Sequence, residues 1–349
     1  MKSSQDTRKL KILILKPSSL GDIIQALPVL RSLKRHLPNS EIYWWIESSL
    51  APLLEGDRDL AGIVRFERQR WAAPKHWAEL GRTLMWTRRH AFDWVIDLQG
   101  LARSAVFGWL ANAKWTVGLD DAREGARGFY DSVARRELFH THAVDRYLGV
   151  LPLLGVPFAP NLEWLPRRHA IADIIYKKWP IADSRWLILQ PGARWLNKRW
   201  PAEFFGELLK QLSEHYPELQ FAILGGVQDR ALGETIARVA PKRCLDLTGA
   251  LSLLEMVEWI RICELMVSND TGPMHVAAAL GKPVIALFGP TEPRRTGPYA
   301  QLKNVLQLNI PCVPCLKSRC HYSPALACLR DLTPSAVFGA VADHLGAGV

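Results

Sequence analysis

One polar turn in the second half of the chain combines residue types that could hold an anion. Residues 268–275 (SNDTGPMH) follow the apolar run 265–267 and precede the small-residue run 277–280, an order that predicts a strand, a turn and a helix. A carboxylate, a hydroxyl and exposed backbone N–H groups at the positive end of a helix favour phosphate binding. The candidate side chains and backbone positions of this turn are Asp270, Thr271, Gly272 and His275.

A second turn, near the start of the chain, supplies a carboxylate. Residues 18–22 (SSLGD) follow the apolar run 11–16 and precede apolar residues at helical spacing. Gly21 permits a tight turn or the close approach of a ligand to the backbone. Asp22 stands where a helix should begin, so it is either a helix cap or a general base at the mouth of a cleft.

A cationic loop follows a predicted strand in the second half. Residues 190–201 (QPGARWLNKRWP) contain Gly192 and three cations before Pro201, which suits the first position of a helix. The loop is either a solvated basic segment or a clamp on a diphosphate leaving group. In the second case the Lys198 ammonium acts as a point charge, and the guanidinium of Arg194 or Arg199 makes bidentate hydrogen bonds to the phosphate oxygens.

Two further segments have a functional and a structural interpretation. Gly225 and Gly226 precede Asp229, which could accept hydrogen bonds from ribose hydroxyls or simply cap a helix. The other segment carries four cysteines with His321 among them, spaced like ligands of a structural zinc ion. Unmetallated thiols or a redox-sensitive pair are the alternatives for Cys312, Cys315, Cys320 and Cys328.

The elements that must position these residues alternate between short apolar runs and helical patterns in both halves. This alternation predicts two α/β domains with parallel sheets facing across a cleft, with ligands at the carboxyl ends of the strands. The segment 155–166 is rich in proline and lacks a clear period, so it is the predicted linker. We therefore expect domains at 1–165 and 166–349, with the last helix packing back onto the first.

Composition restricts the class of partner. The chain has 349 residues, 48% hydrophobic residues and a net charge of +10, which favours an anionic partner. No zinc-finger, helix-turn-helix or RNA-binding signature accompanies this charge, so we expect no nucleic-acid partner. The polar start and the lack of an apolar run near ~20 residues predict a cytoplasmic enzyme. Trp71, Trp77 and Trp86 stand among cations, so their side chains are either core residues or contacts with an anionic membrane surface.

Several motifs resemble those of a known family, the ADP-heptose:lipopolysaccharide heptosyltransferases, which are family 9 glycosyltransferases with the GT-B fold. The resemblance covers about residues 11–331 and rests on the segments 12–22 (ILILKPSSLGD) with Pro28, 268–275 (SNDTGPMH), 281–283 (GKP) and 288–291 (FGPT). It implies two Rossmann-like domains, the first binding the acceptor and the second the nucleotide-sugar donor. The cysteine segment resembles the second-heptose and related branches rather than the first-heptose branch.

The resemblance also implies roles for individual residues. Asp22 would be the base that deprotonates the acceptor hydroxyl, and Lys198 would contact the donor diphosphate. The implied donor site comprises Gly192, Arg194, Asp229, Asp270, Thr271, Gly272 and His275. The implied acceptor site comprises Ser19, Gly21, Arg68, Arg70, Arg123 and Arg146. Gly192-Ala193-Arg194 stands where some members carry small hydroxyl residues, so phosphate contacts there would rest on backbone N–H groups and Arg194.

The function implied is inverting transfer of heptose from ADP-L-glycero-D-manno-heptose to the lipid-linked inner core of lipopolysaccharide. A lipid-linked acceptor implies peripheral contact of the enzyme with the cytoplasmic face of the inner membrane. ADP-heptose is then a co-substrate, and no cofactor or metal is required in the chemistry, because cations and a helix N-terminus can neutralise the leaving ADP. The alternatives are a related GT-B enzyme that uses another nucleotide sugar, such as an epimerase, and a non-catalytic protein that binds nucleotide sugars or nucleic acid.

Overall fold

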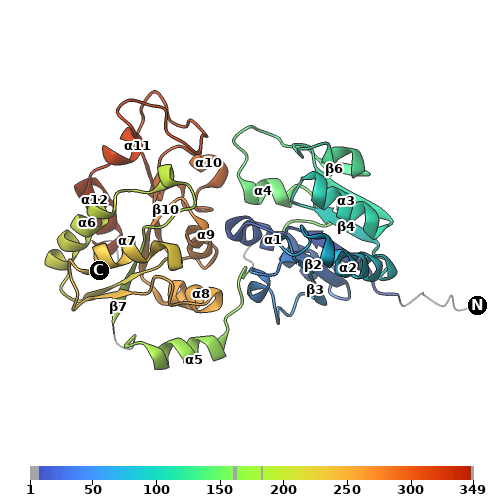
Figure 1. Cartoon of the computed structure of the whole chain (residues 1–349), viewed down its shortest axis with the longest axis horizontal. Coiled ribbons are helices and arrows are strands. Elements are labelled where there is room, and N and C mark those ends of the chain that lie inside the picture. Colours follow the sequence, from blue (N-terminus) through green and yellow to red (C-terminus); the bar gives the residue numbers. More distant parts are fainter. Residues whose placement is uncertain (1–7, 160–162, 182–183, 347–349) are drawn as a thin grey trace, which may run out of the picture. The chain divides into compact units, whose positions relative to one another are not determined.

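The computed structural model describes residues 8–159, 163–181 and 184–346. The chain divides into two compact units, Met1–Trp164 and Leu165–Val349. Each unit contains one six-stranded sheet in which all pairings are parallel, with helices on the sheet (Figure 1). The predicted α/β class with two parallel sheets is therefore confirmed.

The first unit is built around β1 (Lys11–Leu15), whose apolar residues are buried on both faces. Its strand order is β3-β2-β1-β4-β5-β6, and Leu13 pairs with Tyr43 on one side and Val95 on the other. The other strands are β2 (Glu41–Glu47), β3 (Gly62–Phe66), β4 (Trp94–Asp97), β5 (Trp115–Leu119) and β6 (Ser132–Ala134). The three-residue β6 has too short an apolar pattern to be expected from the sequence.

In the described part of this unit the α-helices are α1 (Leu20–His36), α2 (Trp77–Arg89), α3 (Ala102–Ala111) and α4 (Ala143–Leu148). Helix α1 packs against α4, and α2 packs against α3 (Figure 1). Because α4 packs on α1, residues near position 147 come close to the first turn of α1, although about 125 residues separate them in sequence. This pairing of helices creates the surroundings of Asp22.

The second unit repeats the same strand topology. Its order is β12-β11-β10-β7-β8-β9, so the first and fourth strands of the unit are neighbours at the centre, as in the first unit. The strands are β7 (Arg185–Gln190), β8 (Leu219–Ile223), β9 (Cys244–Asp246), β10 (Leu265–Asn269), β11 (Val284–Phe288) and β12 (Val305–Gln307). In such sheets the ligand lies beyond the carboxyl ends of the two central strands, where the strand order reverses.

The helices of the second unit surround this sheet. They are α5 (His169–Lys178), α6 (Ala202–His215), α7 (Arg230–Ala237), α8 (Leu253–Ile262), α9 (Gly272–Ala279), α10 (Pro293–Thr296), α11 (Ala327–Arg330) and α12 (Pro334–Gly346). A capping box begins α8, since Ser252 Oγ accepts from the N–H of Glu255 and the Glu255 carboxylate accepts from the N–H of Ser252.

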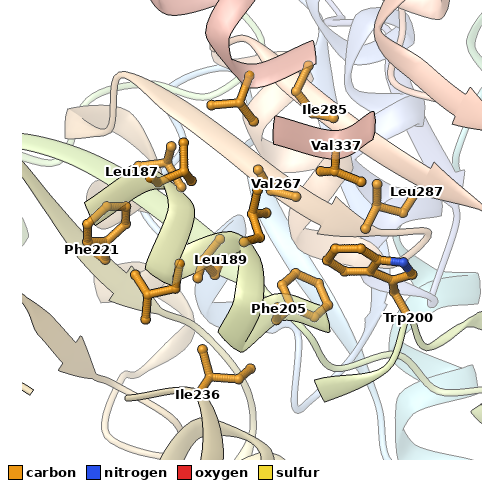
Figure 2. Packing of buried hydrophobic residues seen from close by; sticks show 14 of the residues in the cluster. Leu187, Leu189, Trp200, Phe205, Phe221, Ile236, Val267, Ile285, Leu287 and Val337 are labelled. Carbon is orange, nitrogen blue, oxygen red and sulfur yellow. The ribbon is translucent and has the colours of Figure 1, made fainter. Parts of the chain in front are cut away.

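The core of the second unit explains where the last helix goes. Trp200 and Phe205 pack with strand residues such as Leu189 and Val267, and Val337 of α12 lies in the same cluster (Figure 2). Helix α12 contacts α6 and β11. The buried face of α12 therefore completes the core of the second unit. In the described ranges no helix is both long enough and apolar enough to cross a membrane.

Candidate active site

The first candidate group surrounds Asp22 in the first turn of α1. Asp22 Oδ2 accepts hydrogen bonds from Ser19 N at 3.1 Å and Ser19 Oγ at 2.7 Å. Asp22 Oδ1 accepts from the Tyr147 hydroxyl at 3.1 Å and lies 3.6 Å from Lys16 Nζ. The carboxylate is thus both a helix cap and one partner of a charged cluster, so the two interpretations of Asp22 are compatible.

Exposure and ionisation decide what Asp22 can do. Burial raises its pKa, but the attraction of Lys16 and the hydrogen bonds from Ser19 and Tyr147 outweigh burial and lower the pKa to about 2. Burial within this unit therefore does not offset the effect of the nearby cation and hydrogen-bond donors on Asp22. The Asp22 side chain is still 41% exposed, so an ionised carboxylate remains open to a substrate hydroxyl.

Lys16 is the residue whose importance the sequence did not reveal. Its side chain is almost fully buried, and its ammonium donates to the Leu98 carbonyl oxygen and lies 4.8 Å from the centre of the Tyr147 ring. Burial lowers its pKa, yet Asp22 and Tyr147 reverse this and raise the pKa above the ordinary lysine value. A lysine at the end of an apolar strand is the only signal that the sequence offered.

The predicted acceptor residues lie in different surroundings within the first unit. Ser19 and Gly21 share the first turn of α1 with Asp22. Arg146 forms an ion pair with Asp121 and lies 5.8 Å from the Tyr147 ring, so it belongs to the Asp22 cluster. Arg123 is exposed in the loop after β5, where its N–H donates to the Gly100 carbonyl oxygen at 2.8 Å.

The remaining two acceptor candidates follow β3. Arg70 is exposed and pairs with Glu79 at 2.9 Å. Arg68 is also exposed, and it lines a groove between α2 and α3 together with Trp45 and Trp71. No contact that the structure shows joins these two arginines to the Asp22 cluster, whereas Arg146 is joined to it through Tyr147.

The second candidate group lies at the ends of the central strands of the second unit. Lys198 Nζ donates to Asp270 Oδ2 at 2.6 Å, and Thr291 Oγ1 donates to the same oxygen at 2.6 Å. The Lys198 side chain is 18% exposed and that of Asp270 is 6% exposed. An ammonium has three donors, so Lys198 keeps donors for a diphosphate while Asp270 fixes its position.

The second unit also contains a cavity of about 520 Å³, which is lined by Arg199 and Thr271, the residues that follow Lys198 and Asp270, but not by that pair itself. Its volume falls within the roughly 300–1,000 Å³ typical of small-molecule sites. Gly192, Arg194, Asp229 and Thr271 line it, as the sequence predicted for a donor site. Gly272 begins helix α9, while His275 is buried one turn further on and does not line the cavity. The cavity thus gathers four of the seven predicted donor residues.

Gly192 and Asp229 fit each other closely. A Cβ atom at position 192 would lie 2.4 Å from Asp229 Oδ2, so only glycine leaves room for the carboxylate. That oxygen accepts from Gly226 N at 3.0 Å, and Arg199 approaches Asp229 Oδ1 at 3.3 Å. Asp229 is 3% exposed. This geometry favours the helix-cap alternative, with the carboxylate shaping the cavity wall.

Several residues that shape the cavity were not predicted. Asn269 is fully buried, and its side chain accepts from Trp200 N at 3.1 Å and donates to the Pro191 carbonyl oxygen at 2.7 Å. It therefore ties both ends of the cationic loop to the turn after β10. Asn269 does not itself line the cavity; the unpredicted residues that do are Gln190, Leu224, Gln228, Leu251, Ser252, Leu253, Met256 and Pro273. Gln190 ends an apolar strand, which was a usable signal, whereas nothing local marks Met256.

The four cysteines do come together, but not as a metal site. All four, with His321, line a cavity of about 170 Å³. Within the described residues, however, no group of three or more potential ligands is placed to hold a metal ion. The structural zinc hypothesis is therefore not supported by this arrangement. All four are free thiols, and burial, together with the neighbouring cysteines, raises the pKa of Cys328 to about 11.

Comparison with known proteins identifies the family. The model of glycosyltransferase family 9 (heptosyltransferase) matches residues 77–326, which is most of the chain. The chain belongs to glycosyltransferase family 9. It is therefore a glycosyltransferase of the heptosyltransferase family, as the sequence motifs indicated, and its two parallel sheets are those of the GT-B fold.

Individual members of family 9 align over nearly the whole chain. Lipopolysaccharide heptosyltransferase 1 of Pseudomonas aeruginosa is 29% identical over 327 residues, covering 90% of this chain and 88% of the relative. Lipopolysaccharide heptosyltransferase 2 of Salmonella typhimurium is 28% identical, covering 86% and 88%. The two identities are too similar to distinguish between the first and second enzyme types.

Solved structures show the same architecture. The E. coli heptosyltransferase WaaC with ADP superposes with a TM-score of 0.75 at 25% identity, covering 96% of this chain and all of that one. E. coli ADP-heptose lipopolysaccharide heptosyltransferase II superposes with a TM-score of 0.77 at 24% identity, covering 97% and 99%. The second match supports the fold alone.

Proposed function

We propose that this family 9 enzyme transfers heptose from ADP-L-glycero-D-manno-heptose to the inner core of lipopolysaccharide, with inversion at the anomeric carbon. The observation that carries the proposal is the cavity of the second unit, which is lined by Gln190 at the end of β7 and by Arg199 and Thr271, the residues that follow the paired Lys198 and Asp270. The relative from Pseudomonas aeruginosa is a lipopolysaccharide heptosyltransferase, and the similar E. coli heptosyltransferase WaaC was solved with ADP.

The donor is proposed to bind with its diphosphate near the start of α9. Thr271 N-caps this helix, so the helix presents backbone N–H groups and a partial positive charge to an anion. Arg194 is exposed on the cavity wall and Lys198 is held by Asp270. Together these groups would neutralise the charge that develops on ADP as the bond to the sugar breaks. Met256, Leu251 and Leu253 supply an apolar wall suited to the adenine ring.

The acceptor chemistry is proposed to rest on Asp22. Its carboxylate takes the proton from the attacking hydroxyl as that oxygen bonds to the anomeric carbon and ADP leaves. A pKa near 2 makes Asp22 a weak base, but it guarantees that the carboxylate is ionised at neutral pH. Lys16, which holds it in place, is paired and buried, so the acceptor meets the carboxylate and not the cation.

The acceptor is proposed to be lipid-linked, so we also propose peripheral contact with an anionic membrane surface. The net charge of +10 favours such a surface. Helix α2 exposes Trp77, Met85 and Trp86, which are 60%, 51% and 40% exposed, among arginines. Aromatic side chains among cations are typical of segments that lie at a membrane interface.

Substitution of the proposed base tests the function directly. Asp22→Asn should reduce transfer by at least about 10³-fold, because the amide cannot accept the hydroxyl proton, while ADP affinity stays within about twofold of wild type. Transfer is measured as release of ADP together with elongation of the acceptor in mass spectrometry. This pair of readouts also separates a transferase from an epimerase.

Asp93→Asn is the matched control, since Asp93 is likewise a carboxylate of the first unit that binds a backbone N–H and lysine. It should keep normal turnover. Near-normal turnover of Asp22→Asn would instead exclude Asp22 as the base. A separate experiment, mass spectrometry of lipopolysaccharide from a strain that lacks the protein, would show which heptose is missing.

A further inference from the structure

A groove of about 650 Å³ lies between α2 and α3 of the first unit and has no part in the proposed chemistry. Its floor is aromatic: Trp45 stacks on Phe107 with 4.6 Å between ring centres, and Phe66 contacts both Trp45 and Trp71. Its walls are the apolar side chains Ala72, Leu80, Leu84, Ala102, Val106 and Leu110. The space is therefore large enough for a small ligand and almost entirely apolar.

Only two charged side chains line this groove, Arg68 and Arg103, and both are exposed. Neither guanidinium has a hydrogen bond or an ion pair within the ranges that the structure describes. Two other exposed arginines of this unit, Arg65 and Arg70, form ion pairs with Glu55 and Glu79. The groove thus offers two unneutralised cations beside an apolar channel.

The polar side chains that line the groove are hydrogen-bond donors. Trp45 and Trp71 each have a buried indole N–H without an acceptor in the described chain. The lining contains donors but no side chain that accepts a hydrogen bond. A peptide backbone or a sugar would bury N–H or O–H donors without partners, which is costly. An alkyl chain ending in an ester and a phosphate carries only acceptors, so it matches this lining.

The neighbouring surface of α2 has the same amphipathic character. Met85 and Trp86 line a second hollow of about 500 Å³ together with Arg82 and Arg89. Thus one side of α2 faces the groove through Leu80 and the other carries exposed apolar and cationic side chains. Stable attachment to a membrane requires more than one signal, such as a buried acyl chain together with a basic patch. The groove could bury the acyl chain, and the arginines around α2 form the basic patch.

We propose that the α2–α3 groove binds one acyl chain of an anionic phospholipid, with Arg68 and Arg103 at its phosphate. Trp77, Met85 and Trp86 lie in the interface of the same bilayer. The groove thereby holds the first unit at the membrane that carries the acceptor. This inference rests on the membrane contact in the proposed function, but not on the identity of the donor sugar.

Calorimetry with dodecyl phosphate, below its critical micelle concentration, tests the groove itself. It should bind one per chain and at least about tenfold more tightly than inorganic phosphate or dodecyl maltoside, since only dodecyl phosphate has both the chain and the charge. Val106→Trp fills the groove from an exposed helix position and should weaken binding at least about tenfold. Ile174→Trp, at an exposed position of α5, is the matched control and should bind normally.

A second pair of variants tests whether the positive charge of Arg103 contributes to binding. Arg103→Gln should weaken dodecyl phosphate but not dodecyl maltoside, and Arg238→Gln, which removes the same charge from the second unit, should weaken neither. Equal binding of the two amphiphiles to wild type would overturn the role of the arginines. Unchanged affinity of Val106→Trp for dodecyl phosphate would overturn the assignment of the groove.

Sedimentation with vesicles of phosphatidylglycerol and phosphatidylcholine identifies the occupant. Val106→Trp should pellet less than wild type, whereas Ile174→Trp should pellet to the same extent as wild type. If Val106→Trp loses dodecyl phosphate but pellets normally, a membrane phospholipid is not the occupant. Heptose transfer to a fully deacylated acceptor, and ADP affinity, should be unchanged in Val106→Trp. Loss of transfer in wild type with that acceptor would count against the proposed function and not against the groove.

Discussion

The pairing of Asp22 with Lys16 sets the ionisation of the proposed base. A helix cap and a buried ammonium both favour the charged carboxylate, and burial alone does not overcome them. The proposed base is therefore always ready to accept a proton but has a small driving force to do so. Positioning of the acceptor must then supply more of the rate than proton affinity does.

Removal of the Lys16 charge should change the pH dependence of transfer. In Lys16→Met the burial of Asp22 is no longer opposed by a cation, so its pKa should rise from about 2 toward or above the ordinary carboxyl value of about 4. The acid limb of kcat/KM should then move to higher pH, into the range from about pH 4 to about pH 6, where wild type stays flat. Lys11→Met, at the other end of the same strand, should leave the profile unchanged.

The same pairing predicts the direction of a stability effect. The folded-state pKa of Asp22 lies below its unfolded value, so ionised Asp22 stabilises the fold above about pH 4 and loses this contribution as the pH falls through about 2. Lys16→Met should remove most of this dependence. An acid limb that stays in place in Lys16→Met would show that Asp22 does not set it.

Lys198 is expected to serve both the donor and the fold. Lys198→Ala should lower ADP affinity by about tenfold or more and slow transfer, because a charge-assisted contact to the diphosphate is lost. It should also lower the free energy of unfolding by about 1–3 kcal/mol, because the buried Asp270 carboxylate loses its cation and keeps the hydrogen bond from the uncharged Thr291 hydroxyl. Calorimetry with ADP and thermal unfolding measure the two effects.

Lys178→Ala is the control for this pair. Lys178 forms a longer, 3.5 Å ion pair with Glu255 and its side chain is 49% exposed, so its loss should cost less than about 1 kcal/mol. It should leave ADP affinity unchanged. If Lys198→Ala binds ADP as tightly as Lys178→Ala does, Lys198 does not contact the diphosphate.

At the scale of elements, the cationic loop after β7 depends on close packing. Gly192→Ala would place a methyl group 2.4 Å from Asp229 Oδ2, and Asp229 is held by Gly226 N, so the loop itself must shift. We expect ADP affinity to fall by about tenfold or more and the free energy of unfolding to fall by about 1–3 kcal/mol. Calorimetry and thermal unfolding measure both.

Gly81→Ala is the matched substitution, in α2. Outside the neighbouring backbone of its own helix, no atom lies within 4 Å of the new methyl group there. Because alanine is the better helix former, the free energy of unfolding should rise by about 0.5–1 kcal/mol. ADP affinity should not change. Equal ADP affinity in the two alanine variants would mean that the loop tolerates the added methyl group.

At the scale of the whole molecule, the proposed donor site belongs to one unit. Every residue that lines the 520 Å³ cavity lies between Gln190 and Pro273, inside Leu165–Val349. This unit has its own sheet and its own hydrophobic core. A fragment of residues 165–349 should therefore fold and bind ADP within about tenfold of the affinity of the full chain, while showing no transfer.

Circular dichroism and calorimetry of the fragment test this prediction. The complementary fragment, residues 1–164, contains the Asp22 cluster and should not bind ADP. A folded fragment of the second unit with no measurable ADP affinity would show that the first unit contributes to the donor site.

The local patterns in the sequence determined the class of fold and the elements that carry the site. Residues 11–16 and 265–267 are short apolar runs that end in polar turns, and such runs become buried parallel strands with their ligand-binding loops at one edge. The motifs around Asp22 and Asp270 led to the correct family because their chemistry lies within a few consecutive residues. The short strands β6 and β12 escaped notice because three residues carry too little periodicity.

Only the tertiary structure decided which distant side chains meet. Tyr147 reaches Asp22 because α4 packs on α1, Asn269 ties Pro191 to Trp200, and Met256 enters the cavity from α8. The four cysteines share one small cavity without forming a metal site. Hydrogen bonds, burial and the pKa of Asp22 depend on distances between residues far apart in the chain, and those distances exist only after the helices have packed on the sheets.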